Sequence, residues 1–112
     1  MDSVATHPPF EEFETLRQQR RERAWAAARL AAGLLKARYH ASKVIVFGSL
    51  VETDRFHPWS DIDLAAWGID PADYFEAVAR VLDIGGDIKI DLVRGERSKP
   101  RLRDAVAQGV EL

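Results

Sequence analysis

The sequence predicts an α/β domain in which helices flank a small β-sheet. Three short apolar runs, at residues 43–48, 61–67 and 88–93, have the length of buried strands. Stretches with helical spacing or helix-start signals lie before, between and after them, so helices and strands alternate along the chain. The 112 residues have room for one such domain.

The first part of the chain is expected to be an arm followed by a long helix. Residues 1–9, with two consecutive prolines, predict a flexible arm, and the domain is expected to span residues 10–112. Apolar side chains at three- and four-residue spacing predict a helix over residues 10–39. The predicted buried stripe is Phe10, Phe13, Leu16, Trp25, Ala28, Ala32, Leu35 and Tyr39.

The middle of the chain carries turn and capping signals. A short helix is expected at 49–54 and a loop from there to residue 60. Asp70 is the expected N-cap of the next helix, with Pro71 at its first position. That helix is expected to run to about Leu82 and to bury Tyr74 or Phe75, Val78 and Leu82.

The end of the chain predicts one more helix. Gly85, Gly86 and Asp87 are expected to form the turn that leads into the third strand. Ser98 is the expected cap of a helix over about 99–108, which Gly109 ends.

Three acidic residues stand among the apolar strand residues. Side chains alternate between the two faces of a strand, so Asp61 and Asp63 share one face, and Asp91 shares a face with Lys89. If the two strands are neighbours, the three carboxylates can converge. Two like charges about 4 Å apart repel by roughly 4 kcal/mol at an effective dielectric near 20. A converging cluster must therefore take up a proton or a cation.

The donor set favours magnesium or manganese. Asp61, Asp63 and Asp91 offer hard oxygen ligands, and the chain has no cysteine. Aspartates two residues apart can bridge two metal ions spaced about 3.5–4 Å, the arrangement used for in-line phosphoryl displacement. The sequence therefore predicts these three aspartates as metal ligands and catalytic residues.

A Gly48–Ser49 turn follows the first strand. Glycine permits a tight turn and a close approach of the backbone to a phosphate. Backbone N–H groups at a following helix start attract anions, and the Ser49 hydroxyl can donate to a phosphate oxygen. Gly48 and Ser49 are therefore the candidate nucleotide-binding residues.

The combination of these motifs resembles the nucleotidyltransferase superfamily that includes DNA polymerase beta, and in particular its short minimal nucleotidyltransferases. The resemblance spans residues 43–93 and is carried by Phe47-Gly48-Ser49, Ser60-Asp61-Ile62-Asp63-Leu64 and Ile90-Asp91-Leu92-Val93. The closing segment, Pro100 to Arg103 with Gly109-Val110, is also similar. The resemblance implies an open mixed sheet with the site on one face.

The resemblance also implies a reaction and a partner. In the family the Gly-Ser turn binds the triphosphate, the paired acids hold two Mg²⁺ ions, and the third acid completes the metal site and helps to activate the attacking hydroxyl. Many minimal members are antitoxins of HEPN-domain toxin ribonucleases, and some silence the toxin by transferring AMP to a tyrosine. A transferase that uses ATP and pairs with a HEPN toxin in a hetero-oligomer is therefore expected.

Two departures from the family pattern keep a second interpretation open. Eleven residues, from Leu50 to Ser60, separate the serine from the first aspartate where ten are usual. Glu52 stands where an arginine is common and would repel a triphosphate, while Arg55 can compensate from a shifted loop. The alternative is an antitoxin with weak or no transfer that neutralises a HEPN ribonuclease by direct binding. A phosphatase is disfavoured because Ala65-Ala66 replace the threonine that its motif needs.

Composition restricts the partners and the compartment. The net charge of −2 gives no electrostatic reason to expect direct nucleic-acid binding. The absence of cysteine, of an apparent signal peptide and of a membrane-length apolar run predicts a cytoplasmic protein without membrane contact.

Several further features have two interpretations. The basic cluster Arg17, Arg20, Arg21 and Arg23 is either a solvated helix face or a docking surface. Phe56, His57 and Trp59 either pack their loop or stack on a base or a partner. Lys89 is a surface residue, a phosphate contact or the partner of an acid, and Asp87 is a weaker substitute for Asp91 because it lies in the turn. The three histidines show no metal-ligand spacing.

Overall fold

The computed structural model describes residues 10–52 and 55–112. Its helices are α1 (Phe10–Tyr39), α2 (Tyr74–Gly85) and α3 (Pro100–Ala107). Its strands are β1 (Lys43–Phe47), β2 (Ile62–Trp67), β3 (Ile90–Arg94) and β4 (Val110–Glu111). The predicted arm at residues 1–9 lies outside the described residues, as do residues 53–54 of the predicted short helix.

The four strands form one mixed sheet in the order β3-β2-β1-β4. β1 is antiparallel to both β2 and β4, whereas β2 and β3 run parallel. This confirms the α/β class and the mixed sheet. The two-residue strand β4 was not predicted, because a strand so short has no periodicity to recognise.

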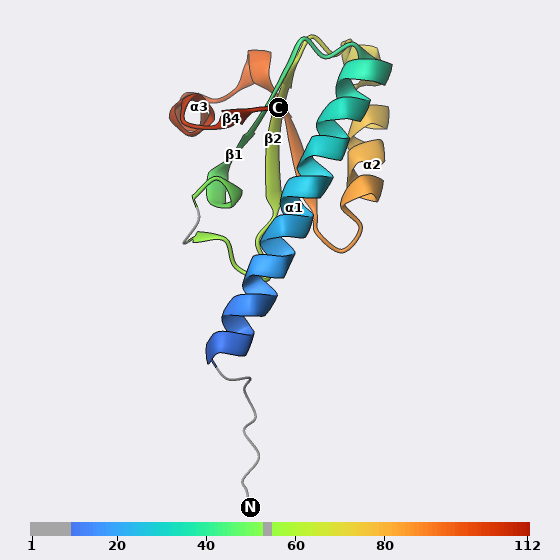
Figure 1. The fold of residues 1–112 in the computed structure, drawn as a ribbon. Helices are drawn as coiled ribbons and strands as arrows, with labels where there is room; N and C mark the ends of the chain where they lie inside the picture. The colour runs from blue at the N-terminus through green and yellow to red at the C-terminus, as the bar shows by residue number, and fades with distance from the viewer. Residues whose placement is uncertain (1–9, 53–54) are drawn as a thin grey trace, which may run out of the picture.

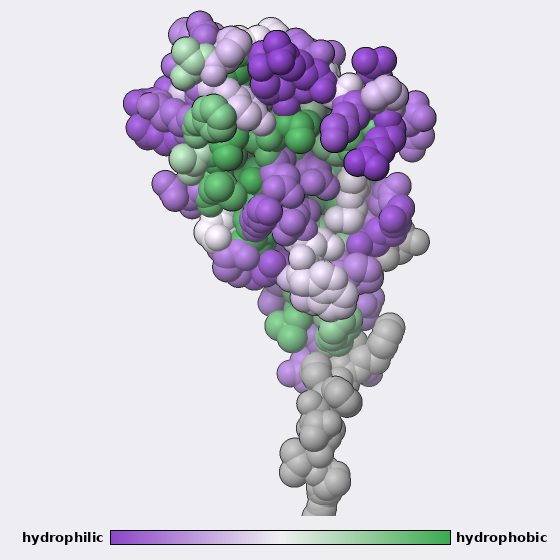
Figure 2. Space-filling model, turned by 180° about the vertical axis from the view of Figure 1, so that it is seen from behind, coloured by the Kyte–Doolittle hydropathy of each residue, from purple (hydrophilic) through white to green (hydrophobic). Residues whose placement is uncertain are grey.

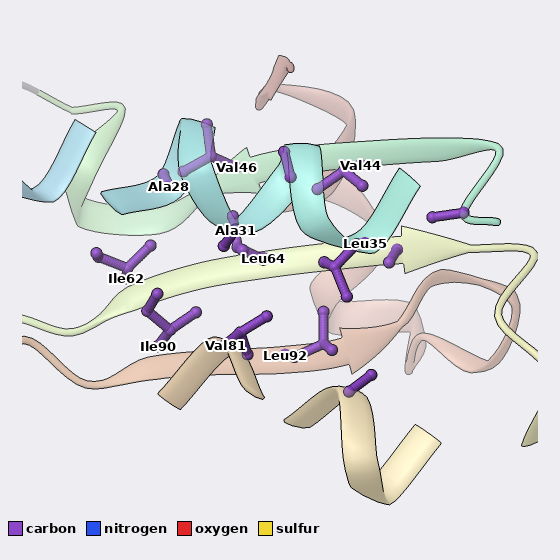
Figure 3. Close-up of a cluster of buried hydrophobic side chains, with 14 of the residues drawn as sticks. Ala28, Ala31, Leu35, Val44, Val46, Ile62, Leu64, Val81, Ile90 and Leu92 are labelled. Atoms are coloured by element: carbon purple, nitrogen blue, oxygen red, sulfur yellow. The ribbon is translucent and has the colours of Figure 1, made fainter. Parts of the chain in front are cut away.

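The main core lies between the sheet and the layer formed by α1 and α2, which pack side by side (Figure 1). Alternate residues of β1, β2 and β3 point into this layer and meet the small and branched residues of the two helices (Figure 3). The side chains labelled there are Ala28, Ala31, Leu35, Val44, Val46, Ile62, Leu64, Val81, Ile90 and Leu92.

The opposite face of the sheet is only partly covered. α3 packs there through Val106 against Phe47 and Ala65, which form a second, smaller cluster. Figure 2 shows the molecule from behind, where apolar side chains are bordered by hydrophilic ones. Asp63 and Asp91 belong to this second face, because they alternate with the core residues Ile62, Leu64, Ile90 and Leu92.

The helix α1 has the predicted bounds but not the predicted stripe along its whole length. Ala28, Ala32, Leu35 and Tyr39 are buried as expected. Phe13 and Leu16 are exposed, which corrects their prediction as core residues. The reason is geometric, because the first turns of α1 extend past the end of the sheet (Figure 1).

The helix α2 faces the core through a stripe that matches the prediction only in part, because the predicted Tyr74 and Val78 are half-buried against the core. Its buried residues are Ala77, Val81 and Gly85, spaced four apart. Phe75 and Leu82, the latter predicted to be buried, are exposed, and Tyr74 is half-buried. A 3₁₀ turn over Pro71–Asp73, which Asp70 caps by accepting a hydrogen bond from Ala72 N–H at 2.8 Å, precedes the helix.

The last helix lacks the predicted cap. The Ser98 hydroxyl donates to the carbonyl oxygen of Gly95 at 3.0 Å, and Lys99 occupies the N-cap position without a side-chain hydrogen bond. Pro100 at the first helical position supplies the start, because its fixed φ suits a helix. None of the described helices has both the length and the apolar character needed to cross a membrane.

Candidate active site

The predicted carboxylates of β2 and β3 lie side by side. Asp63 pairs directly with Asp91 in the parallel register, and on its other side Asp63 pairs with Phe47 of β1. Asp61 precedes β2 and is half-buried, as are Asp63 and Asp91. The sheet therefore brings the acids of two separate segments together, as the parity of the strand residues predicts.

Gly48 lies directly against Asp63. It begins a 3₁₀ turn over Gly48–Leu50 and has a φ of +79°, a backbone conformation that residues other than glycine rarely adopt. A Cβ atom at this position would lie 2.5 Å from Oδ2 of Asp63. Glycine therefore has a second effect at this position, because a Cβ would displace the Asp63 carboxylate from the place it occupies.

The environment of Asp63 opposes its charge. Burial is the largest cause, followed by the negative charges of Asp91 and Asp61, and together they raise the pKa of Asp63 to about 6. Neither Asp61 nor Asp63 has an ion-pair partner among the described residues. The raised pKa of Asp63 is therefore that of a carboxylate without a nearby cation.

Lys89 meets one of the three acids. Its Nζ lies 3.4 Å from Oδ1 of Asp91, and the two side chains are 60 % and 42 % exposed. Of the interpretations given to Lys89, pairing with an acid is the one present in the structure. The ammonium pairs with Asp91 alone, so no ion pair among the described residues compensates Asp61 or Asp63.

The donor set suits a hard divalent cation, although the side chains are not gathered into a complete ligand group. Among the described residues, no three His, Cys, Asp or Glu side chains are placed so that they could hold a metal ion as they stand. The raised pKa of Asp63 is nevertheless the effect that a bound cation would remove. The assignment of Asp61, Asp63 and Asp91 as metal ligands stays a prediction, and the residues fit that group chemically.

The segment after Gly48 is shallow and open. Ser49 is half-buried in the 3₁₀ turn, and a hollow of about 70 Å³ beside it is lined by Gly48, Val51 and Glu52 with two residues of the α3 region. Enclosed ligand pockets usually have about 300–1,000 Å³. This turn can therefore contact a phosphate, but the described residues form no closed pocket for a base there.

Glu52 has a compensating partner. Its Oε2 accepts a hydrogen bond from Arg55 Nη1 at 2.8 Å, so the acid at the position where the family commonly has an arginine is paired with a cation. Both side chains are exposed, and the pair contributes little to stability. The pairing reduces the repulsion that Glu52 alone would exert on a triphosphate.

One residue near the site has a contact that the sequence did not predict. Arg21 of α1 donates from Nη2 to the carbonyl oxygen of Leu50 at 3.3 Å, which ties the end of the Gly48–Leu50 turn to the long helix. The sequence showed only a run of arginines. Its other members have acidic partners, because Arg17 pairs with Glu14, and Arg20 and Arg23 pair with Asp87.

The aromatic loop before Asp61 is stacked and partly exposed. The rings of His57 and Trp59 lie parallel, with centroids 5.0 Å apart, and Trp59 is 74 % exposed, whereas Phe56 is fully buried. Phe56 therefore packs the loop onto the core. Asp87, the weaker substitute for Asp91, is occupied by the two arginines of α1.

Comparison with solved structures places this geometry in a known fold. The chain is similar to a protein assigned to the minimal nucleotidyltransferases, with 27% identity, a TM-score of 0.60 and coverage of 96% of this chain and 100% of the other. It is also similar to a chain of a mutant MntA–HpeT toxin–antitoxin complex, with 20% identity, a TM-score of 0.58 and coverage of 76% and 70%.

A chain of the complex between tri-AMPylated Shewanella oneidensis HEPN toxin and its MNT antitoxin matches more distantly, at 19% identity and a TM-score of 0.46, with coverage of 85% of this chain and 70% of that one. No protein-family model and no curated protein matches the sequence. The fold predicted from the motifs is confirmed: the chain has the minimal nucleotidyltransferase fold.

Proposed function

We propose that this protein is a metal-dependent nucleotidyltransferase that moves AMP from ATP onto a hydroxyl group of a HEPN-family toxin and thereby acts as its antitoxin. One observation carries the proposal. Asp63 and Asp91 are paired across parallel strands beside Gly48, in a chain with the minimal nucleotidyltransferase fold. The raised pKa of Asp63 supports it, because a carboxylate that lacks a cation is a suitable ligand for one.

The roles of the residues follow from their positions. Asp61, Asp63 and Asp91 would hold Mg²⁺ or Mn²⁺, which when bound would polarise the α-phosphate and stabilise the leaving pyrophosphate. Gly48 and Ser49 would contact the triphosphate through backbone N–H groups and the hydroxyl. Asp91 would accept the proton of the attacking hydroxyl as the new bond to the α-phosphorus forms.

The small size of the hollow beside Gly48 supports a protein acceptor. The described residues around Gly48 form only a small hollow, so they cannot surround both a nucleotide and its acceptor. The exposed apolar side chains Phe13, Leu16 and Leu30 on α1 offer area to another chain. A toxin–antitoxin partner also agrees with the shared fold of the MntA–HpeT chain, and this part of the proposal goes beyond that likeness.

The test is transfer of labelled AMP from ATP in the presence of Mg²⁺. The purified chain would be incubated with the product of the neighbouring gene, and the variant Asp61→Asn/Asp63→Asn would serve as the control. We expect label on the partner with the wild type and at least about a hundredfold less with the variant, because each lost ligand weakens transition-state stabilisation.

A different outcome would assign neutralisation by direct binding. If no label appears, yet a stable complex forms equally well with Asp61→Asn/Asp63→Asn, the chain masks its partner without chemistry. The transfer proposal would then be wrong, and restoring an arginine at position 52 would show whether the acid there is the reason.

A further inference from the structure

A basic groove shares no lining residue with the carboxylate site. It has a volume of about 420 Å³ and runs between the start of α2, the end of β3 and the start of α3. Tyr74, Val93 and Leu102 contribute apolar surface to it. Its charged lining residues are Arg94, Arg97, Lys99 and Arg101, and none of the described residues that line it is acidic.

The cations of this groove differ from the other basic cluster of the chain. Three members of the arginine cluster of α1 have acidic partners, since Arg17 pairs with Glu14, and Arg20 and Arg23 share Asp87. Within the described part of the chain, no salt bridge involves Arg94, Arg97, Lys99 or Arg101. The four cations line one groove and repel one another, and an anionic ligand would remove that repulsion.

The one acid within residues 94–103 is engaged elsewhere. Glu96 accepts a hydrogen bond from Gly68 N–H at 2.7 Å, and this bond holds the pKa of its carboxyl below the usual range. Glu96 does not line the groove. Its carboxylate is therefore committed to the turn after β2, and of the four cations only Arg94 contributes to its lowered pKa.

Aromatic rings adjoin these cations. The Arg94 guanidinium carbon lies 6.0 Å from the centroid of the Tyr74 ring, and the Tyr74 hydroxyl donates to the carbonyl oxygen of Leu92 at 2.5 Å, which fixes that ring in place. Phe75 meets Tyr74 edge-on, with centroids 6.1 Å apart, and is 83 % exposed. The exposed Phe75 ring thus adjoins an aromatic residue that lines the basic groove, and exposed rings beside a basic groove bind unpaired bases and their phosphates.

We propose that this groove binds a single strand of nucleic acid, with phosphates on Arg94, Arg97, Lys99 and Arg101 and a base stacked on Phe75. An acidic protein segment would satisfy the cations but would leave the exposed ring without a specific use. The net charge of −2 does not oppose the proposal, because charges further apart than about 8 Å are largely screened at physiological salt. A ligand in the groove therefore experiences mainly the charges of the groove itself.

The test is binding of a fluorescein-labelled 12-nucleotide single-stranded RNA, followed by fluorescence anisotropy in EDTA. EDTA removes divalent ions, so the result does not depend on the proposed transfer reaction. We expect the logarithm of the binding constant to fall with the logarithm of the salt concentration with a slope of about −2 to −3, because three or four phosphates are contacted at roughly −0.7 each.

The variants separate the groove from overall charge. Arg97→Ala/Lys99→Ala/Arg101→Ala is expected to weaken binding at least about tenfold, and Phe75→Ala about fivefold or more, because stacking contributes independently of charge. The matched control is Arg29→Ala/Arg38→Ala/Arg80→Ala, which removes the same charge from exposed positions on α1 and α2. The control is expected to bind within about twofold of the wild type. Circular dichroism would confirm that each variant is folded.

Three results would overturn the proposal. Equal losses in the two triple variants would show that only net charge matters. A 12-base-pair duplex that binds as tightly as the single strand, with no effect of Phe75→Ala, would exclude base stacking. Displacement of the RNA by poly-glutamate at equal or lower concentration would assign the groove to an acidic protein segment.

Discussion

At the scale of single residues, Gly48 and Asp63 depend on each other. A methyl group at position 48 would meet the Asp63 carboxylate and would also need a positive φ. Gly86 provides a matched control, because it has a φ of +62° with no atom within 4 Å of the added Cβ. The two glycines share a positive φ and differ in the contact that a Cβ would make.

We predict that Gly86→Ala lowers the free energy of unfolding by about 1 kcal/mol and Gly48→Ala by about 2 kcal/mol or more. The extra loss arises because the Asp63 side chain must move away. Urea unfolding of the two variants would measure the difference. Equal losses would show that Gly48 serves the turn alone.

The Asp63 carboxyl gives stability a specific pH dependence. Its folded-state pKa of about 6 lies above the ordinary value of 3.8, so the folded protein holds this proton more tightly than the unfolded chain does. The resulting stabilisation is complete below about pH 4 and is lost as the pH rises through 6. Above that pH the charged Asp63 destabilises the fold.

We predict that Asp63→Asn is more stable than the wild type at pH 7 in EDTA, by on the order of 1 kcal/mol once solvent screening of this half-exposed group is allowed for. The gain should shrink toward zero at pH 4, where both proteins carry a neutral side chain. Urea unfolding at the two pH values would measure it. A gain of equal size at both would contradict the pKa argument.

At the scale of elements, α1 is divided into a packed part and an exposed part. Leu35 is fully buried against the sheet, whereas Leu16 is 53 % exposed on the turns that extend past it. We predict that Leu35→Ala costs about 2–5 kcal/mol of unfolding free energy and Leu16→Ala less than about 0.5. Thermal or urea unfolding would compare them, and a large loss for Leu16→Ala would place that residue in an unrecognised contact.

The elements also show what the sequence could predict. The acids could be placed on one face because strand parity depends only on counting residues from Asp61 to Asp63 and along the third strand. The buried stripe of α2 could not be chosen, because apolar residues at 74, 75, 78, 81 and 82 cover more than one face, and packing against β3 selects Val81. The first turns of α1 are exposed because they extend past the end of the sheet, and no local sequence pattern shows where the sheet ends.

Across the whole molecule, the two faces of the sheet differ in how far they are covered and in the side chains they carry. One face is buried under α1 and α2 and holds the main core. The other is covered only in part by α3 and carries Asp63 and Asp91. Asp63 pairs with Asp91 because β2 and β3 are neighbouring parallel strands. The periodicity of the sequence could not predict this strand arrangement, whereas the family resemblance did.

Asp63 and Asp91 are proposed ligands of a divalent-metal centre on the second face of the sheet. The most direct measurement is titration of the chain with Mn²⁺, followed by the loss of free-ion electron paramagnetic resonance signal, with Asp83→Asn as a matched charge control on α2. We predict saturable binding that Asp63→Asn and Asp91→Asn each weaken at least about tenfold, because each removes one charged ligand. The control should bind like the wild type. Binding that is unchanged in Asp63→Asn and Asp91→Asn, or weakened equally in Asp83→Asn, would contradict the assignment of this pair as a metal site.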